Sequence, residues 1–300
     1  MRLRGSALLL LALAAPAAAQ RMERDLAYGG DPAQRLDLSL PAAPGFPTVI
    51  FVHGGSLTRG DKADGDYRHV CEPFTAAGMG CANINYRLAP GHAWPAQAED
   101  VAAAVAWVHR NIGARGGDPA RLSLFGHSSG ATLVALVGAD ARYLAAHGMT
   151  TAGLHAVIPM GSIMWDDDLE RAIDERGRAA VEAAFRRDPD NAMFASLDDY
   201  LEHWPIRHVR AGLPRYLFLI AEAEQEQPPV LRTNRAFVEQ AAALGNQADY
   251  RVLPGRTHDS ALSKLGEPGD PVFALIRDFI DAPARDSLYI PNGGSSAVGP

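Results

Sequence analysis

The stretch "RLSLFGHSSGATLVAL", residues 121–136, contains a run of strand-forming residues, a glycine-flanked turn and then a run typical of a helix. The turn is "GHSSG", residues 126–130. A serine on a sharp turn between a strand and a helix exposes its hydroxyl above the sheet, and small flanking residues are needed because the next helix passes close. The motif therefore predicts Ser128 as a nucleophile, and the alternative is a glycine-rich turn without chemistry.

The segments around this turn alternate between apolar strands and helical patterns. The other strand candidates are "TVIFVHGG", "CANINYR", "LHAVIPM", "RYLFLIAE" and "YRVLPG", and the helical patterns cover residues 67–77, 96–112, 130–145, 230–244 and 272–280. Strands buried on both faces that alternate with helices predict an α/β fold with a mainly parallel central sheet. At the N-terminal side, "MERDLAY" and "QRLDLSL" alternate apolar and polar residues around "GGDPA", which predicts an antiparallel hairpin.

The alternation is interrupted by residues 162–210, which are rich in charge and in helix formers. This length is unusual for a simple connection and predicts a helical insertion, in part a solvated excursion and in part a lid over the site. Met164 and Trp165, at its start, are candidate contacts for a substrate. We expect one main domain over residues 20–282, and a loose tail over the Gly-, Ser- and Pro-rich residues 283–300.

Residues 1–19 combine a short cationic start, an apolar run and an alanine-rich cleavage pattern. This combination predicts a signal peptide, and hence export to the periplasm or secretion. The apolar run is too short for a permanent membrane span. A net charge of −7 argues against nucleic acid or an anionic membrane as the main partner.

A second glycine-rich turn follows the strand candidate in "VIFVHGGS", residues 49–56. Glycines there allow backbone N–H groups to approach a bound carbonyl oxygen. We expect the amides of Gly55 and Ser56 to hold a developing oxyanion. The amide of Ser129, at the start of the helix after the nucleophile, is the third expected donor.

A general base and its orienting acid should follow the last strands of the sheet. His258, in "YRVLPGRTHDS", follows a strand and a glycine-containing loop, so it is the candidate base. The segment "RYLFLIAEAEQEQPP" offers Glu222, Glu224 and Glu226. Triad geometry favours Glu224, although the sequence leaves its two neighbours open.

The chain has two cysteines, Cys71 and Cys81. Neither lies in a multi-ligand spacing pattern, so we expect no metal site. Export would permit a disulfide, but the sequence cannot test its geometry. Whether these cysteines are joined therefore stays open at this point, as does the oligomeric state.

With these residues in place, the chain resembles the α/β-hydrolase superfamily. More closely, it is similar to carboxylesterases of the hormone-sensitive-lipase-like and bacterial feruloyl-esterase-like or kynurenine-formamidase-like types. The similarity rests on "VHGGS", on "NINYRLAPGHAWPAQAEDVAAAVAWV" and on "DPARLSLFGHSSGA". Ser56 departs from the pattern, because many relatives have a third glycine or a bulky aromatic residue there.

The resemblance implies an α/β-hydrolase fold and a serine esterase with Ser128, His258 and Glu224 as its triad. It also implies that no metal or organic cofactor is required. The expected partner is a small-molecule ester with a short acyl chain or an aryl group. The alternatives are an aryl-formamide amidase or a small serine peptidase on the same fold, or a binding protein without activity.

Overall fold

Eight strands form one sheet in the order β1-β2-β4-β3-β5-β6-β7-β8 in the computed structural model of the chain. The structure describes residues 20–226 and 228–283, so the predicted signal peptide and nearly all of the predicted tail lie outside the described residues. The strands are β1 (Arg21–Ala27), β2 (Arg35–Leu40), β3 (Phe46–Val52), β4 (Gly80–Ile84), β5 (Gly117–His127), β6 (Ala156–Met160), β7 (Arg215–Ala221) and β8 (Ala248–Leu253).

The strand directions confirm the predicted architecture. β1 and β2 pair antiparallel, and β2 then pairs antiparallel with β4. From β4 through β3 to β8 every pairing is parallel, with Ile50 opposite Leu124 between β3 and β5. The carboxyl ends of these parallel strands therefore open onto one edge of the sheet, where ligands of such folds bind.

Helices cover both faces of the sheet, and side chains along β3 alternate between the two layers. Val49 and Phe51 pack into one apolar core, whereas Ile50 and Val52 pack into the other, as the period of two in a strand requires. The helices against the first core are α1 (Cys71–Ala76), α9 (His258–Ser263) and α10 (Pro271–Asp281). Those against the second are α2 (Ala96–Ile112), α3 (Ser129–Ala139), α4 (Ala141–Ala145) and α8 (Pro228–Ala243).

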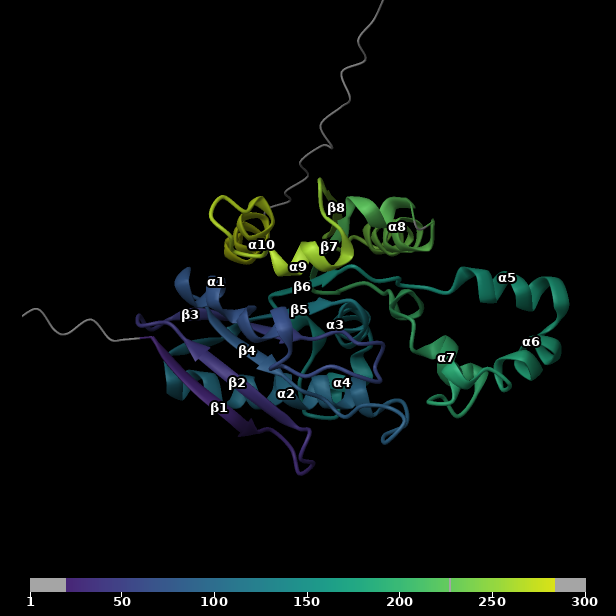
Figure 1. The fold of residues 1–300 in the computed structure, drawn as a ribbon, viewed down its shortest axis with the longest axis horizontal. Helices are drawn as coiled ribbons and strands as arrows, with labels where there is room; N and C mark the ends of the chain where they lie inside the picture. Colours follow the sequence, from purple (N-terminus) through teal and green to yellow (C-terminus); the bar gives the residue numbers. More distant parts are fainter. Residues whose placement is uncertain (1–19, 227, 284–300) are drawn as a thin grey trace, which may run out of the picture.

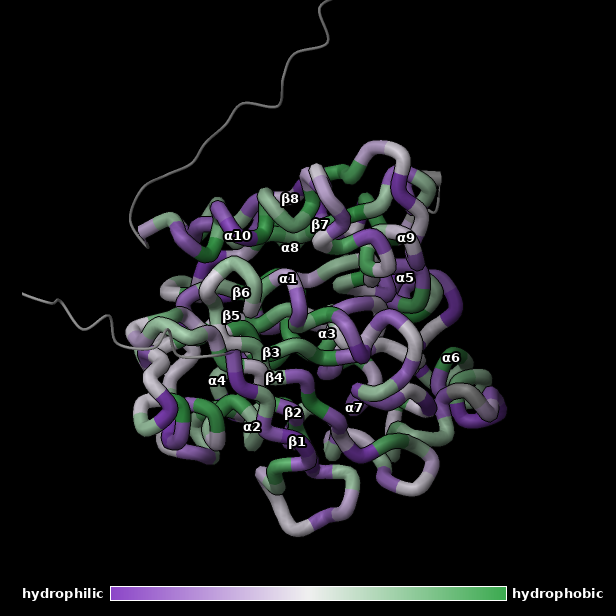
Figure 2. The backbone as a smooth tube through the Cα atoms, turned by 60° about the vertical axis from the view of Figure 1, so that its left-hand side comes forward, coloured by the Kyte–Doolittle hydropathy of each residue, from purple (hydrophilic) through white to green (hydrophobic). Residues whose placement is uncertain are grey.

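The colours of Figure 2 show the same division: hydrophobic residues gather along the central strands and α3, and hydrophilic residues lie toward the outside. Short 3-10 helices complete the connections: η1 (Gly65–His69), η2 (Gly113–Arg115), η3 (Thr151–Gly153) and η6 (Glu222–Glu226). Among the described helices, none is long and apolar enough to cross a bilayer.

Two helix predictions differ from the structure. The helix expected over residues 130–145 is interrupted at Asp140, whose backbone is extended and whose carboxylate accepts the N–H of Arg142. Aspartate competes for backbone groups in this way, so it ends α3 and caps α4. The helix expected over residues 67–77 divides into η1 and α1 at Val70.

The predicted insertion lies between β6 and β7 and projects beside the body of the protein (Figure 1). It has a small apolar core of its own, made by Val181, Phe185, Leu197 and Leu201. Its elements are α5 (Asp167–Arg176), α6 (Arg178–Phe185), η4 (Pro189–Asn191), α7 (Leu197–Glu202) and η5 (Pro205–His208).

A disulfide joins Cys71 to Cys81, with the two Cα atoms 5.4 Å apart. It connects the first residue of α1 to the buried strand β4. The structure therefore answers the question that the sequence left open for these two cysteines.

Candidate active site

Ser128 occupies a strained turn between β5 and α3. Its φ of 55° and ψ of −131° are unusual for a residue with a side chain. The backbone N–H of Ser128 donates to the carbonyl oxygen of Met160, 2.9 Å away, which fixes the turn to the end of β6. Strain of this kind persists only where the surrounding structure enforces it, and it gathers at functional sites.

Gly126 and Gly130 explain why the turn has a glycine on each side. A Cβ on Gly126 would lie 2.3 Å from the carbonyl oxygen of Gly130. A Cβ on Gly130 would lie 2.2 Å from the carbonyl oxygen of Val52 in β3. Since these neighbours are backbone atoms that cannot yield, larger residues would push α3 away from the sheet and displace Ser128.

Glu224 and His258 form a hydrogen-bonded pair, although 34 residues separate them. The Glu224 Oε1 atom lies 2.7 Å from His258 Nδ1, and its Oε2 atom accepts the N–H of Ala221 at 2.8 Å. The Glu224 side chain is buried, with 3% of its surface exposed. Glu222 is exposed and instead accepts the N–H of Gly255. The side chain of Glu226 is not among those described.

The pair has the electrostatics of a base and its orienting acid. The hydrogen bond to Glu224 raises the pKa of His258, and burial opposes the rise. Because Nδ1 donates to the carboxylate, Nε2 is the nitrogen that can accept a proton. The imidazole of His127, beside it, has its pKa lowered to about 4 by burial and by the nearby charge of His258, so it is neutral at pH 7.

The loops that carry the acid and the histidine are tied to each other. The N–H of Ala223 donates to the carbonyl oxygen of Arg256 at 3.1 Å, in addition to the bond between Glu222 and Gly255. Thr257 and Ser260 form a reciprocal capping box around the start of α9. These bonds fix the position of His258, which is the first residue of that helix.

Gly161 lies next to both the serine turn and the Glu224–His258 pair. This residue follows Met160, the hydrogen-bond acceptor of Ser128, and has a φ of +68°. A Cβ on Gly161 would lie 3.0 Å from both Glu224 Oε1 and His258 Nδ1. The end of β6 thus contacts the serine turn on one side and the acid–base pair on the other.

The predicted oxyanion loop lies directly after β3. Gly55 has a φ of +118° and Ser56 a φ of +55°, so the chain turns sharply there. Tyr86 supports the loop, because its ring stacks on His53 and its hydroxyl donates to the His53 carbonyl oxygen. Ser129 begins α3, and the first N–H groups of a helix have no partner within it.

A cavity of about 300 Å³ opens at these residues. Ser56, Ser128 and Ser129 line one end of it. The rest is formed by the loop after β3, by the segment before α2, by one side of α3, by the chain after β6 and by the insertion: Leu57, Trp94, Thr132, Leu133, Leu136, Ser162, Ile163, Asn191, Met193, Phe194, Tyr200, His203 and Trp204.

Met164 and Trp165 are not among the residues that line this cavity. Met164 is fully buried in the second core, and its N–H donates to the Thr233 hydroxyl. Trp165 packs against the same core. The expectation that they contact substrate is therefore corrected, because the chain between β6 and α5 packs against α8 and the second core. The aromatic residues of the insertion that line the cavity instead lie over residues 194–204, and they were not identified from the sequence.

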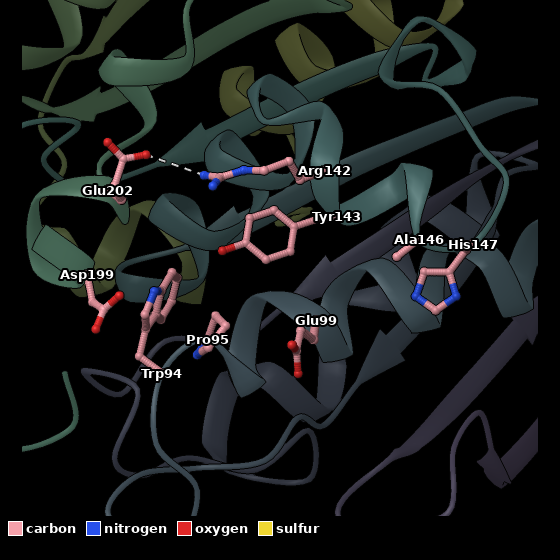
Figure 3. A pocket seen from close by; sticks show the side chains of 9 residues that line it. All are labelled: Trp94, Pro95, Glu99, Arg142, Tyr143, Ala146, His147, Asp199 and Glu202. Carbon is pink, nitrogen blue, oxygen red and sulfur yellow. Dashed lines mark hydrogen bonds and ion pairs between the residues drawn. The ribbon is translucent and has the colours of Figure 1, made fainter. Parts of the chain in front are cut away.

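A second pocket, of about 350 Å³, also has Trp94 in its lining (Figure 3). Its other walls come from the start of α2, from α4 and from α7, and Figure 3 shows Arg142 paired with Glu202 across it. Within residues 20–226 and 228–283, no group of three or more His, Cys, Asp or Glu side chains could hold a metal ion.

A family model described as the alpha/beta hydrolase fold matches residues 49–262, which include the predicted oxyanion loop, the serine turn, Glu224 and His258. The chain belongs to the α/β-hydrolase family. In this α/β-hydrolase the matched region begins in β3 and ends in α9, so the whole insertion lies inside it.

Known proteins resemble this α/β-hydrolase in sequence and in fold. The esterase LipC of Mycobacterium tuberculosis is 33% identical over 266 residues, 84% of this chain and 63% of LipC. LipM of the same organism is 27% identical over 253 residues, 79% of this chain and 57% of LipM. The chain thus spans about 60% of the length of these two relatives. A thermophilic esterase of Thermogutta terrifontis, solved with propionate bound, superposes with a TM-score of 0.67 at 22% identity, covering 88% of this chain and 94% of that one.

Proposed function

We propose that this α/β-hydrolase is a serine carboxylesterase that uses Ser128, His258 and Glu224. The observation that carries the proposal is the 2.7 Å contact between Glu224 and His258 Nδ1, beside the strained turn of Ser128. The esterase names of relatives such as LipC support the same class of reaction.

In the first half of the reaction, His258 Nε2 removes the proton of the Ser128 hydroxyl as the oxygen attacks the ester carbonyl carbon. The buried carboxylate of Glu224 stabilises the imidazolium that forms and holds its tautomer. His258 then gives the proton to the leaving alcohol, and the acyl group stays on Ser128.

The amides of Gly55, Ser56 and Ser129 hold the negative oxygen of the tetrahedral intermediate. Each such donor contributes about 3–4 kcal/mol of transition-state stabilisation in enzymes of this kind. In the second half, His258 removes a proton from water as the water oxygen attacks the acyl carbon. His258 then returns that proton to the Ser128 oxygen as its bond to the acyl group breaks and the acid leaves. Both halves use the same three donors and the same base.

The substrates that we propose are esters with short acyl chains or aryl groups. A cavity of about 300 Å³ is at the small end of ligand pockets. Its walls combine the leucines of α3 with the aromatic rings of Trp94, Phe194 and Trp204. Such walls favour a compact apolar group over a long flexible chain.

Labelling with a fluorophosphonate tests the nucleophile. We expect the wild-type protein to bind one probe per chain, Ser128→Ala to bind none, and Ser129→Ala to keep labelling. Ser129→Ala is the matched control because it changes the neighbouring hydroxyl and keeps the backbone amide. An unlabelled wild-type protein would overturn the proposed mechanism.

A substrate panel tests the bond that is cleaved. We expect kcat/KM to be highest for p-nitrophenyl esters of short acids, and lower by orders of magnitude for formanilides and peptides. The opposite order would replace the esterase with an amidase or a peptidase while keeping the triad.

We also propose that the protein is exported. The signal-peptide pattern of residues 1–19 supports this, as does the disulfide between Cys71 and Cys81, because disulfides persist mainly in oxidising compartments. Mass spectrometry of the protein from its native host should find a mature N-terminus near Gln20. An intact N-terminus in the cytoplasmic fraction would contradict export.

A further inference from the structure

We propose that His127 and Tyr67 are positioning residues that hold the backbone of His258 and connect it to the oxyanion loop. This inference rests on the proposed function, since it assigns roles around the same base. It goes beyond the triad, because neither side chain is needed for the proton transfers described above.

His127 contacts His258 at two points. Its Nε2 atom lies 3.0 Å from the carbonyl oxygen of His258, and the two rings are 4.6 Å apart between centroids. The side chain is buried, with 4% of the residue exposed. Because His127 directly precedes Ser128, this contact ties the histidine loop to the serine turn across 131 residues of sequence.

The partners of His127 determine its tautomer. A carbonyl oxygen only accepts hydrogen bonds, so Nε2 must carry the proton that reaches His258. With a pKa of about 4, the ring is neutral at pH 7, and Nδ1 therefore offers a lone pair. The hydroxyl of Tyr67 lies 3.3 Å from Nδ1 and is positioned to donate to it.

Tyr67 is itself held in place. Its carbonyl oxygen accepts a 2.7 Å hydrogen bond from Asn83 Nδ2, and its ring lies against Phe51 and His53 at the end of β3. The backbone of Gly54 forms a hydrogen bond with the phenol oxygen, which opposes the rise in the Tyr67 pKa caused by burial.

The result is one directional set of hydrogen bonds from Gly54, through Tyr67 and His127, to the carbonyl oxygen of His258. The imidazole of His258 is thus positioned from two sides: Glu224 orients its ring, and His127 holds its backbone. The charged or titratable groups that act on His127 are Tyr67, Glu224, His258 and Asp259.

The test compares His127→Leu with His127→Gln, because glutamine keeps an N–H donor close to the position of Nε2. We expect His127→Leu to lower kcat about 10- to 100-fold with KM within a few-fold, since a misplaced base slows chemistry more than binding. His127→Gln should retain kcat within about 3-fold, because it keeps the hydrogen bond to His258. His69→Leu, at an exposed site two residues from Tyr67, is the control and should match the wild type.

Tyr67→Phe removes the hydroxyl that faces His127 Nδ1. If His127→Leu does not fold, the kcat of Tyr67→Phe tests the positioning role. Alone it should lower kcat several-fold, and combined with His127→Leu it should cause no further loss, because both changes break the same set of bonds. Equal kcat losses in His127→Leu and His127→Gln, a loss confined to KM, or additive losses in the double variant would each overturn the proposal. If fluorophosphonate still labels the variants completely, at a reduced rate, Ser128 remains a working nucleophile. Any of these three outcomes would then overturn the positioning role and leave the proposed function standing.

Discussion

The carbonyl oxygen of Met160 accepts the backbone N–H of Ser128 at 2.9 Å, so the end of β6 sets the position of the serine turn. The next residue, Gly161, lies against the Glu224–His258 pair. One backbone segment therefore aligns the three groups of the proposed triad, although they come from three different loops.

Gly161→Ala should lower kcat at least about 10-fold. Its φ of +68° disfavours a side chain, and the added Cβ would lie 3.0 Å from Glu224 Oε1 and from His258 Nδ1. Gly153→Ala is the control, since the nearest atom to its Cβ would be 4.0 Å away. Steady-state kinetics with a p-nitrophenyl ester measure both variants, and equal activity in the two would contradict the alignment role.

Glu224→Gln should lower kcat by orders of magnitude, whereas Glu222→Gln should change it by no more than about 3-fold. Only the first removes the carboxylate that orients His258 and stabilises its charged form. Glu222 bonds the backbone of Gly255 instead. If Glu222→Gln were the slower enzyme, the acid would have to be reassigned.

The pH dependence of kcat/KM should show an acidic limb that reports His258. The base works only when neutral, and Glu224 raises its pKa, so activity should fall as the pH decreases through a midpoint above 6.5, the ordinary histidine value. His127, with a pKa of about 4, should add no step near that midpoint. In Glu224→Gln the residual activity should have its midpoint at a lower pH, and an unchanged midpoint would exclude His258 as the titrating group.

Phe194→Ala should raise kcat/KM for longer acyl chains relative to acetate by several-fold. The change enlarges the cavity that contains Ser128, and each methylene seated in an apolar pocket contributes about 1–3 kcal/mol to discrimination. Trp165→Phe is the control, because Trp165 packs against the core and not on the cavity. A series of p-nitrophenyl esters with acyl chains of increasing length gives the ratio of kcat/KM for each chain to that for acetate. If Trp165→Phe changed these ratios and Phe194→Ala did not, the acyl group would not lie in this cavity.

Replacing both cysteines, Cys71→Ser with Cys81→Ser, should lower the free energy of unfolding by about 3 kcal/mol. That is the magnitude expected when a crosslink closes a loop of roughly ten residues. Urea unfolding with and without reductant measures the loss, and reduced wild-type protein should match the double variant. Two free thiols in the purified, oxidised protein would show that the bond does not form.

Much of the fold was predictable because it depends on local patterns. The helix expected over residues 96–112 is α2 with the same bounds, and the antiparallel hairpin was expected from a period of two. The periodicity did not predict that α3 ends and α4 begins at Asp140. This break depends on one side chain, the capping carboxylate of Asp140, and periodicity cannot detect it.

The sequence by itself determined the candidate nucleophile, the order of the triad and the two glycine turns, because strand, turn and helix signals act over a few neighbouring residues. Only the tertiary structure decided that Glu224 and not Glu222 contacts His258, that Cys71 and Cys81 are joined, and that the rings of the insertion line the cavity where Met164 and Trp165 were expected. These facts depend on contacts between segments far apart in the chain. Such contacts are fixed when the helices pack on the sheet, and no local pattern specifies them.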